Sequence, residues 1–355
     1  MFKTLQAAGV VAVAALALTG CAANEGTPAS DLTGTLNGAG ASSQGSAQEA
    51  WYSAFQTANG GVTINYDPSG SGAGREAFLS GAVAFAGTDS YLKDDELTTE
   101  SPLCVPGTGF FEIPVYVSPI AVVVNVEGVD AINLSSATIS HIFKGDITNW
   151  NDAAIVAENP GLALPDLAIT AVHRSDDSGT TKNFSKYLAE TAGDIWDGEV
   201  SDTFPYTTGE GASGTSGVID AVTNGTGTIG YADASKAGGL VSAAIKVGDA
   251  WVQHSAEAAA AILPISTAVA DRTETDMAFD LDRKTTDSSV YPLVLVSYLV
   301  GCNDYDDDAT GVLVNAYASY IISEEGQAAA AEAAGSAPVT GAIREQAATI
   351  ASAIK

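Results

Sequence analysis

Apolar runs of strand length alternate with helix-spaced apolar positions along most of this chain. Residues 62–66 alternate like a strand, and residues 83–86 form a short apolar run typical of a buried strand. Between them we expect a helix over about 75–80. The order of strand, Gly/Ser turn, helix and strand is typical of an α/β fold.

Two longer apolar runs, at 114–126 and 292–300, predict long strands. We expect the first to cross between two domains and the second to return the chain to the first domain. Helices are predicted at 218–223 and over most of 310–355. The Ala-rich stretch 327–334 is interpreted as helix, because alanine has the highest helix propensity.

The N-terminus has the pattern of a secretory signal. Lys3 is the only charged residue before Cys21, and residues 7–18 form an apolar core too short for a comfortable membrane span. The Leu-Thr-Gly before Cys21 resembles a bacterial lipobox, which predicts a signal peptide at 1–20, a lipid on the Cys21 thiol and a polar tether at 21–34. A plain signal peptide with a chance cysteine is the alternative. The predicted location is extracytoplasmic, anchored to the outer face of the cell membrane.

The charge balance narrows the classes of function. The 355 residues include 14 Lys+Arg against 43 Asp+Glu, a formal net charge of -29. This balance argues against nucleic acid as a partner and against membrane docking through a basic patch. If the protein binds an anion, long-range attraction cannot drive the binding. Local backbone dipoles and one or two cations must do so.

After Cys21, only Cys104 and Cys302 remain. In an exported protein such a pair favours a disulfide. A Cys/His zinc site has little support, because the chain has three histidines and no CxxC motif. We therefore expect no metal and no cofactor.

Three turns share one design, in which small hydroxyl or glycine residues stand where a helix begins. They are Ala41-Ser42-Ser43, Ser71-Gly72-Ala73 and Ser178-Gly179-Thr180. The first N–H groups of a helix lack internal partners, glycine lets the backbone approach a ligand, and a hydroxyl adds a donor. One such turn is usually only a helix cap. Three of them, with Arg174 before the last, predict a cage of donors for a tetrahedral oxyanion. No GK[ST] follows the glycines, so a Walker A loop is not indicated.

Asp89 ends a predicted strand at a Gly-Thr turn, where an anion site could lie. A carboxylate repels an anion unless the anion carries a proton to donate, as monohydrogen phosphate does and sulfate does not. The alternative is that Asp89 caps the next turn. Asp176 could orient Arg174 through an ion pair, or could be a plain helix N-cap.

Enzyme chemistry finds little support in the sequence. No G-x-S-x-G nucleophile elbow occurs. His173 could be imagined as a base for Ser178, but adjacency in sequence is poor support for a triad. The aspartate-rich run 304–308 lacks the glycine and distal glutamate of an EF-hand loop, so we interpret it as a solvated loop or cap.

These turns belong to a longer set of motifs, through which the chain resembles the phosphate-binding proteins of bacterial phosphate ABC transporters. The markers are NGAGASSQ at 37–44, YDPSGSGAG at 66–74, VAFAGTDSYL at 83–92, IFKGDITNWND at 142–152, VHRSDDSGTT at 172–181 and GTIGYAD at 227–233. The resemblance covers nearly the whole mature chain. It implies a two-lobed, periplasmic-binding-protein-like α/β clamshell of type II with two crossovers between lobes. Lobe I would comprise 35–114 plus 290–355, and lobe II 115–289.

The resemblance also implies roles for single residues. The family's ligand contacts fall on Ser42, the backbone of Ser43, Ser71, Asp89 as the proton-accepting carboxylate, Arg174 as the single cation with Asp176 as its partner, and Ser178, Gly179 and Thr180 as helix-terminal donors. The implied function is high-affinity capture of inorganic phosphate and its delivery to the membrane permease subunits of an ABC transporter. We expect a monomer.

Two positions depart from the family pattern. Family members often have an aromatic residue where this chain has Ser43. Because the contact there is made by the backbone N–H, binding should survive with a less apolar pocket wall. The pair Cys104 and Cys302 is not general in the family. Both would fall in the discontinuous lobe, near the crossovers, where a disulfide would staple that lobe.

Three other functions stay open. The first is a receptor for another oxyanion, such as sulfate or molybdate, which Asp89 disfavours. The second is an exported phosphoryl-transfer enzyme or phosphatase, which the lack of a metal-ligand cluster and of a credible nucleophile–base pair disfavours. The third is a surface adhesin or sensor that has kept the fold, and the sequence holds no argument against it.

Overall fold

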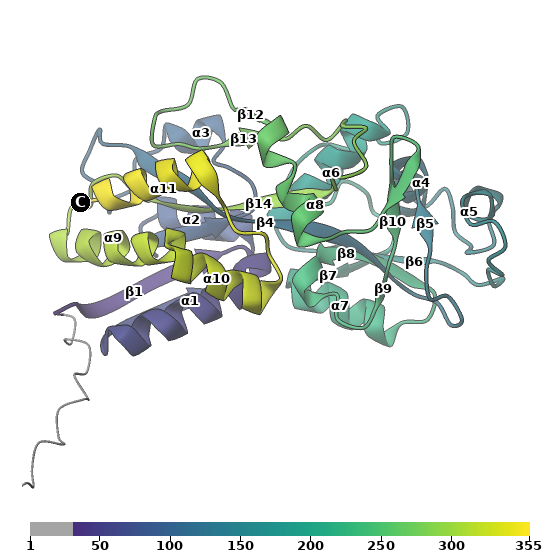
Figure 1. The fold of residues 1–355 in the computed structure, drawn as a ribbon, viewed down its shortest axis with the longest axis horizontal. Helices are drawn as coiled ribbons and strands as arrows, with labels where there is room; N and C mark the ends of the chain where they lie inside the picture. The colour runs from purple at the N-terminus through teal and green to yellow at the C-terminus, as the bar shows by residue number, and fades with distance from the viewer. Residues whose placement is uncertain (1–30) are drawn as a thin grey trace, which may run out of the picture.

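Two long antiparallel strands run through the middle of the molecule, at the junction of its two halves (Figure 1). The computed structural model describes residues 31–355. β4 (Phe110–Asn125) pairs along its first part with β14 (Val294–Cys302) and along its last part with β8 (Thr228–Asp233). Both strands are almost entirely buried, as expected for Val- and Ile-rich runs packed on both faces. β4 carries the chain from one half to the other.

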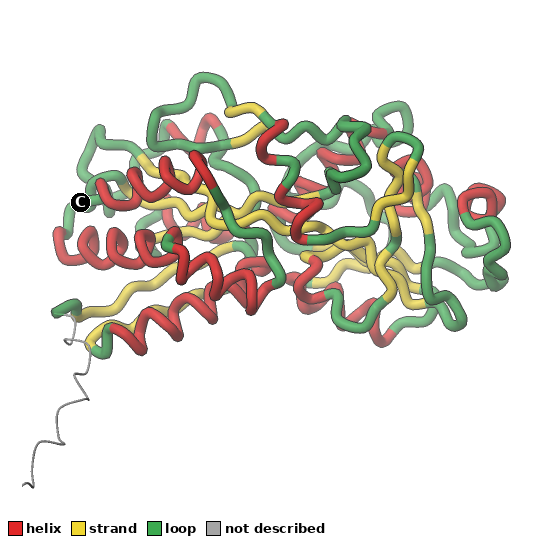
Figure 2. The backbone as a smooth tube through the Cα atoms, viewed as in Figure 1, coloured by secondary structure: helices red, strands yellow, loops and turns green. Residues whose placement is uncertain are grey.

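The central sheet has the strand order β2 (Gly61–Asp67), β1 (Thr33–Gly40), β3 (Phe85–Thr88), β14, β4, β8, β6 (Thr170–Arg174) and β7 (Glu210–Ala212). β9 (Val241–Ser242) also pairs with β4. β1 runs parallel to β2 and β3, and β6 runs parallel to β7 and β8. β14 and β4 are antiparallel to their neighbours. Helices surround these strands in both halves (Figure 2). The predicted α/β class is therefore confirmed.

What we call the first half lies on the left of Figure 1 and joins the beginning of the described chain to its end. Besides most of β14, it contains β1 (Thr33–Gly40), the 3-10 turn η1 (Ser42–Gln44), α1 (Gly45–Ala58), β2 (Gly61–Asp67), α2 (Ser71–Leu79), β3 (Phe85–Thr88), α3 (Asp94–Leu97), α9 (Asp308–Ile322), α10 (Glu324–Ala334) and α11 (Gly341–Ala353). The helix predicted at 75–80 begins earlier, at Ser71, so the Ser-Gly-Ala turn is its first turn. α10 confirms the helical interpretation of the Ala-rich stretch.

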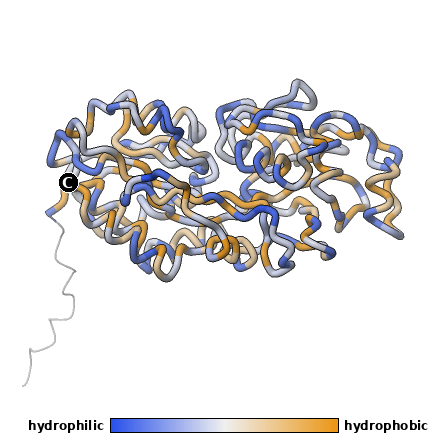
Figure 3. The backbone as a smooth tube through the Cα atoms, turned by 90° about the horizontal axis from the view of Figure 1, so that it is seen from above, coloured by the Kyte–Doolittle hydropathy of each residue, from blue (hydrophilic) through white to orange (hydrophobic). Residues whose placement is uncertain are grey.

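The second half lies on the right and is formed by the middle of the chain. It contains β5 (Asn133–Leu134), α4 (Ser136–Lys144), α5 (Ala153–Glu158), β6 (Thr170–Arg174), α6 (Gly179–Thr191), β7 (Glu210–Ala212), α7 (Gly214–Asn224), β8, η2 (Ala234–Lys236), β9 (Val241–Ser242), β10 (Ala244–Val247), β11 (Ala250–Val252), α8 (Ala256–Ala260) and η3 (Leu263–Ile265). Seen from above, the molecule is elongated and narrows between the halves (Figure 3). No helix within residues 31–355 combines the length and apolarity needed to span a bilayer.

A small hairpin, β12 (Thr267–Ala268) with β13 (Phe279–Asp280), returns to the first half before β14 begins. The Glu112 N–H of β4 donates to the Thr275 carbonyl at 2.9 Å, and the Met277 N–H donates to the Glu112 carbonyl at 2.8 Å. This stretch was expected in lobe II, between 115 and 289. Its backbone hydrogen bonds instead place it against the first half.

Of the N-terminal predictions, only the end of the tether, from residue 31 on, falls within the described residues. Thr33 and Gly34 pair with Gly61 and Val62 in the β1–β2 ladder, so the tether predicted at 21–34 is wrong for these two residues. The predicted signal peptide, Cys21 and the tether up to residue 30 lie outside the described residues.

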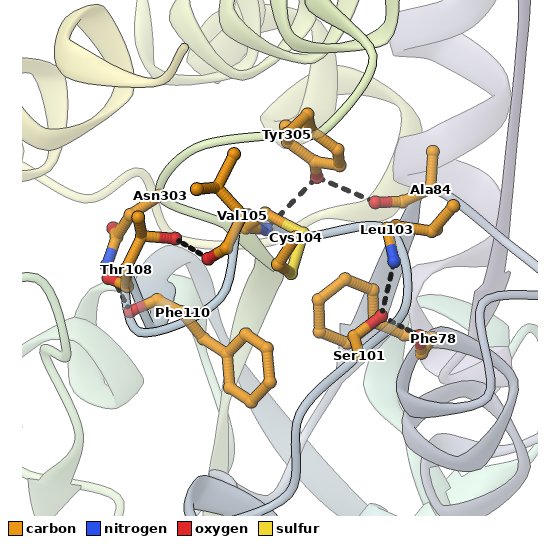
Figure 4. The surroundings of a disulfide bond; sticks show 11 residues. Phe78, Ala84, Ser101, Leu103, Cys104, Val105, Thr108, Phe110, Asn303 and Tyr305 are labelled. Carbon is orange, nitrogen blue, oxygen red and sulfur yellow. Dashed lines mark hydrogen bonds between the residues drawn. A yellow bond between two sulfur atoms is a disulfide. The ribbon is translucent and has the colours of Figure 1, made fainter.

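Cys104 and Cys302 form a disulfide with a Cα–Cα distance of 5.3 Å (Figure 4). It joins the loop before β4 to the last residue of β14, two segments 198 positions apart. The Tyr305 hydroxyl accepts from the Cys302 N–H at 3.2 Å and donates to the Ala84 carbonyl at 2.7 Å. The disulfide staples the discontinuous half, as predicted. It lies away from the crossover, however, because Cys302 pairs with Phe110 at the outer end of β4.

Candidate anion-binding site

The Asp89 carboxylate lies at the centre of the predicted site. It directly follows β3, is 3% exposed, and accepts hydrogen bonds from three hydroxyls: Ser43 at 2.6 Å, Ser297 at 2.7 Å and Thr180 at 3.2 Å. Burial raises the pKa of Asp89, and these hydroxyls and the charge of Arg174 act in the opposite direction. Asp89 is thus not a simple turn cap, because its carboxylate gathers donors from both halves of the molecule.

The second predicted turn brings α2 against α6. The Ser71 hydroxyl oxygen accepts from the Asp89 N–H at 3.1 Å, and the Gly72 N–H donates to the Asp177 carbonyl at 3.1 Å. A Cβ atom on Gly179 would lie 2.6 Å from Ser71 Oγ and 2.8 Å from Asp89 Cβ. Position 179 therefore requires glycine, because the two halves approach each other this closely.

The third predicted turn is the start of α6. Ser178 is its N-cap, and the Ser178 side chain accepts from the Thr181 N–H at 3.2 Å. This cap uses the hydroxyl oxygen as an acceptor and does not consume the hydroxyl proton. The N–H groups of Gly179 and Thr180 belong to the first turn, where a helix offers no acceptor of its own. The positive end of the α6 dipole therefore lies beside Asp89.

Arg174 is the last residue of β6 and is 3% exposed. Its guanidinium donates two hydrogen bonds to the Asp176 carboxylate. Nε donates to Oδ1 at 2.7 Å, and Nη2 donates to Oδ2. Partial burial opposes ionisation of Asp176, but the hydrogen bonds and charge of Arg174 and the N–H of Gly214 lower its pKa. The predicted ion pair is present, and the alternative role of Asp176 as helix N-cap is filled by Ser178 instead.

The first predicted turn contacts the second half through Ser42. The Thr215 N–H donates to Ser42 Oγ at 3.0 Å, and the two hydroxyl oxygens are 2.9 Å apart. The three turns, Asp89 and the Arg174–Asp176 pair thus surround one place between the halves.

Three members of this network were not singled out from the sequence. Ser297 carried a signal, since it interrupts an apolar strand run. Thr215 lies in the first turn of α7, within a stretch rich in Gly, Ser and Thr, which is a weaker signal. Asn183 donates to the Asp89 carbonyl at 2.7 Å, yet nothing in the pattern distinguishes it from an ordinary helix residue.

The donor set defines what the site can do. Within residues 31–355, no three His, Cys, Asp or Glu side chains gather in a way that could hold a metal ion. The site offers hydroxyl and backbone donors, one paired arginine and a buried carboxylate. Such a set can hold the oxygens of an anion by directional hydrogen bonds, and its carboxylate can accept a proton that the anion carries.

Residues 25–325 match the family model of the PBP superfamily domain, so the fold and the site define a binding protein of this superfamily. Phosphate-binding protein PstS 3 of Mycobacterium leprae is 34% identical over 292 residues, which is 80% of this chain and 77% of the relative. PstS 3 of Mycobacterium tuberculosis (strain ATCC 25618 / H37Rv) is 33% identical over 328 residues, 88% of each chain. The chain belongs to the PstS family of phosphate-binding proteins.

Solved structures show the same fold. A high-affinity periplasmic phosphate-binding protein, PfluDING, bound with phosphate, superposes with a TM-score of 0.70 at 22% identity, covering 88% of this chain and 92% of its own. The phosphate-binding protein from Stenotrophomonas maltophilia gives 0.66 at 21%, covering 89% and 93%. At these identities the likeness supports the fold.

Proposed function

We propose that this chain captures inorganic phosphate outside the cytoplasm with high affinity and delivers it to the permease subunits of an ABC transporter. Membership of the PstS family supports this role. The single observation that carries it is the position of Asp89, a buried carboxylate facing the N-terminus of α6 and the Arg174 pair. A carboxylate in an anion site favours an anion that donates a proton to it.

In the proposed complex, the first and second halves act as lobes I and II and close around dehydrated phosphate. Arg174, fixed by Asp176, supplies the single cationic contact. Neutral donors come from the Ser43 backbone, from the hydroxyls of Ser42, Ser71 and Ser178, and from the first turn of α6. Asp89 accepts the phosphate proton. Its two oxygens receive three hydroxyl hydrogen bonds, which leaves acceptor capacity in an ionised carboxylate.

The other candidate functions lack comparable support. Sulfate at neutral pH has no proton for Asp89, so the carboxylate would repel it. A phosphoryl-transfer enzyme needs an activated nucleophile or a metal. The Ser178 hydroxyl serves as a helix cap, and the His173 ring is stacked on Phe204 with its Nδ1 at 2.9 Å from the Arg174 carbonyl.

Calorimetric titration of phosphate and sulfate near neutral pH tests the proposal. We expect tight phosphate binding and sulfate binding weaker by at least about 30-fold, since an unsatisfied and repelled acceptor costs about 2–5 kcal/mol. Comparable affinity for sulfate would remove the proton-acceptor role of Asp89. No binding of phosphate would remove the proposed function itself.

A further inference from the structure

Asp202 connects three segments of the proposed phosphate site. It lies in the loop between α6 and β7, in the second half. Its backbone carbonyl accepts from the Ser178 N–H at 2.8 Å, at the N-cap of α6. Its carboxylate contacts the first half. It accepts hydrogen bonds from Arg75 Nη2 at 2.7 Å and from the Ser90 hydroxyl at 2.8 Å. One residue thus ties α6 to α2 and to the residue after Asp89.

Both charges of this bridge are buried, with the Arg75 side chain 1% and the Asp202 side chain 4% exposed. Burial opposes ionisation of Asp202, but the charges of Arg75 and Lys182 and the hydrogen bonds from Arg75 and Ser90 lower its pKa. Burial likewise opposes the charge of Arg75, and its carboxylate partners nevertheless raise its pKa. Loss of one partner from such a pair leaves the other charge buried with less compensation.

Arg75 is held in place within the first half, independently of Asp202. Its Nε donates to both Glu96 oxygens at 3.0 Å, and its Nη1 donates to Thr88 at 3.1 Å and to Ser90 at 2.8 Å. These contacts all lie within the first half, so they can order the arginine side chain before the halves meet. A preorganised partner makes the contact with Asp202 more favourable when the halves close.

We propose that Asp202 is a positioning residue that holds the two halves closed over bound phosphate and slows its release. The inference rests on the proposed function. Arg75 lies one turn after Ser71 on α2, and Ser90 directly follows Asp89. Closure through Asp202 therefore sets the donors of α2 and α6 at the same time as it seals the site. It also explains why Arg75, although close to the site, is not a second cation for the ligand, because Glu96 and Asp202 occupy its guanidinium.

The variant Asp202→Asn removes the charge and keeps the backbone carbonyl. Each protein is loaded with 32P-labelled inorganic phosphate and chased with excess unlabelled phosphate. Because breaking a buried charge pair acts mainly on dissociation, release should be at least about tenfold faster than from the unmodified protein, with association changed by less than about threefold. The matched control is Asp197→Asn in the same loop. Its partner Lys144 lies in the same half, at 2.8 Å, so its release rate should equal that of the unmodified protein.

Arg75→Gln removes the positive charge of the Arg75–Asp202 pair. It tests the proposal if Asp202→Asn does not fold. It should also accelerate release. The effect of the double variant should be smaller than the product of the two single effects, because both changes break the Arg75–Asp202 pair. Release from Asp202→Asn at the rate of the unmodified protein, or strictly additive effects in the double variant, would overturn the role of Asp202 while phosphate binding stands. If the unmodified protein does not bind phosphate, the proposed function fails instead.

Discussion

The Ser297 hydroxyl donates to the Asp89 carboxylate at 2.7 Å, although 208 positions separate the two residues. The contact follows from the antiparallel pairing of β3 with β14, in which Tyr298 lies opposite Thr88. Because Asp89 directly follows β3 and Ser297 lies on the adjacent strand β14, the carboxylate is oriented by the framework and not by a ligand. An acceptor fixed in this way can discriminate between anions without having to reorganise when one binds.

Replacing Asp89 with asparagine should narrow the discrimination between phosphate and sulfate. The neutral amide no longer repels a fully ionised oxyanion, and its N–H can donate to one. We expect the ratio of sulfate to phosphate dissociation constants to fall by at least about tenfold, while phosphate binding is weakened but not necessarily lost. Calorimetric titration of both anions near neutral pH measures this ratio. Asp67→Asn, at the exposed end of β2, is the matched control. Unchanged selectivity in Asp89→Asn would show that Asp89 does not distinguish an anion that carries a proton from one that does not.

Arg174→Ala should weaken phosphate binding by about 1.5–3 kcal/mol, the scale of one charged hydrogen-bonding partner. The loss has a direct part, the missing cation, and an indirect part, because Asp176 loses its buried partner. Titration calorimetry measures the effect. Arg344→Ala serves as the control, because Arg344 of α11 pairs with the exposed Glu324 of α10 at 3.2 Å. The phosphate affinity of this variant should equal that of the unmodified protein. Unchanged affinity in Arg174→Ala would place Arg174 outside the site.

The sequence predicted what depends on local pattern. β4 and β14 were visible as apolar runs, and the three turns were visible because Gly and Ser mark the starts of helices. Ser297 and Asp202 were not identified as site residues, because their roles depend on partners more than 100 positions away that share no local periodicity with them. The hairpin β12–β13 was assigned to the wrong side for the same reason: its backbone partner Glu112 lies far away in the chain.

Removal of the disulfide should lower stability without changing phosphate affinity. The double variant Cys104→Ser/Cys302→Ser frees a loop closed by residues 198 positions apart, and we expect the free energy of unfolding to fall by about 2–4 kcal/mol. Urea unfolding of both proteins without reductant measures the loss. Affinity should stay within about twofold, because the bridge lies at the outer end of β14. A large loss of affinity with unchanged stability would contradict the structural role.

The predicted lipid anchor can be tested on the exported protein. Cleavage before Cys21 would make this residue the new N-terminus and its thiol the site of lipid attachment. Mass spectrometry should therefore find a lipid-modified Cys21 at the N-terminus of the membrane-associated protein. Cys21→Ser should be released from the membrane fraction with unchanged phosphate binding. An unmodified Cys21 in the exported protein would refute lipidation.

Asp233 gives the protein a pH dependence that can be separated from phosphate binding. It ends β8 opposite Ile120, where β4 enters the second half, and it is 1% exposed. Its Oδ2 has no hydrogen-bond partner among the described residues. Burial raises the pKa of Asp233 from 3.8 to about 6, against the opposing hydrogen bonds of Ser235.

Because its folded pKa lies above its unfolded pKa, Asp233 contributes stability at low pH and loses that contribution as the pH rises through about 6. Between pH 8 and pH 5, this group should add about 1.4 kcal/mol to the free energy of unfolding, a gain that Asp233→Asn lacks because an amide does not titrate. In the unmodified protein the Ser235 N–H donates to Asp233 Oδ1 at 2.9 Å, and the amide oxygen of the variant can still accept this hydrogen bond. Urea unfolding of both proteins at the two pH values measures the difference, in which the titration of Asp89 and Glu112 cancels. Parallel pH dependence in the two proteins would mean that Asp233 does not titrate in this range.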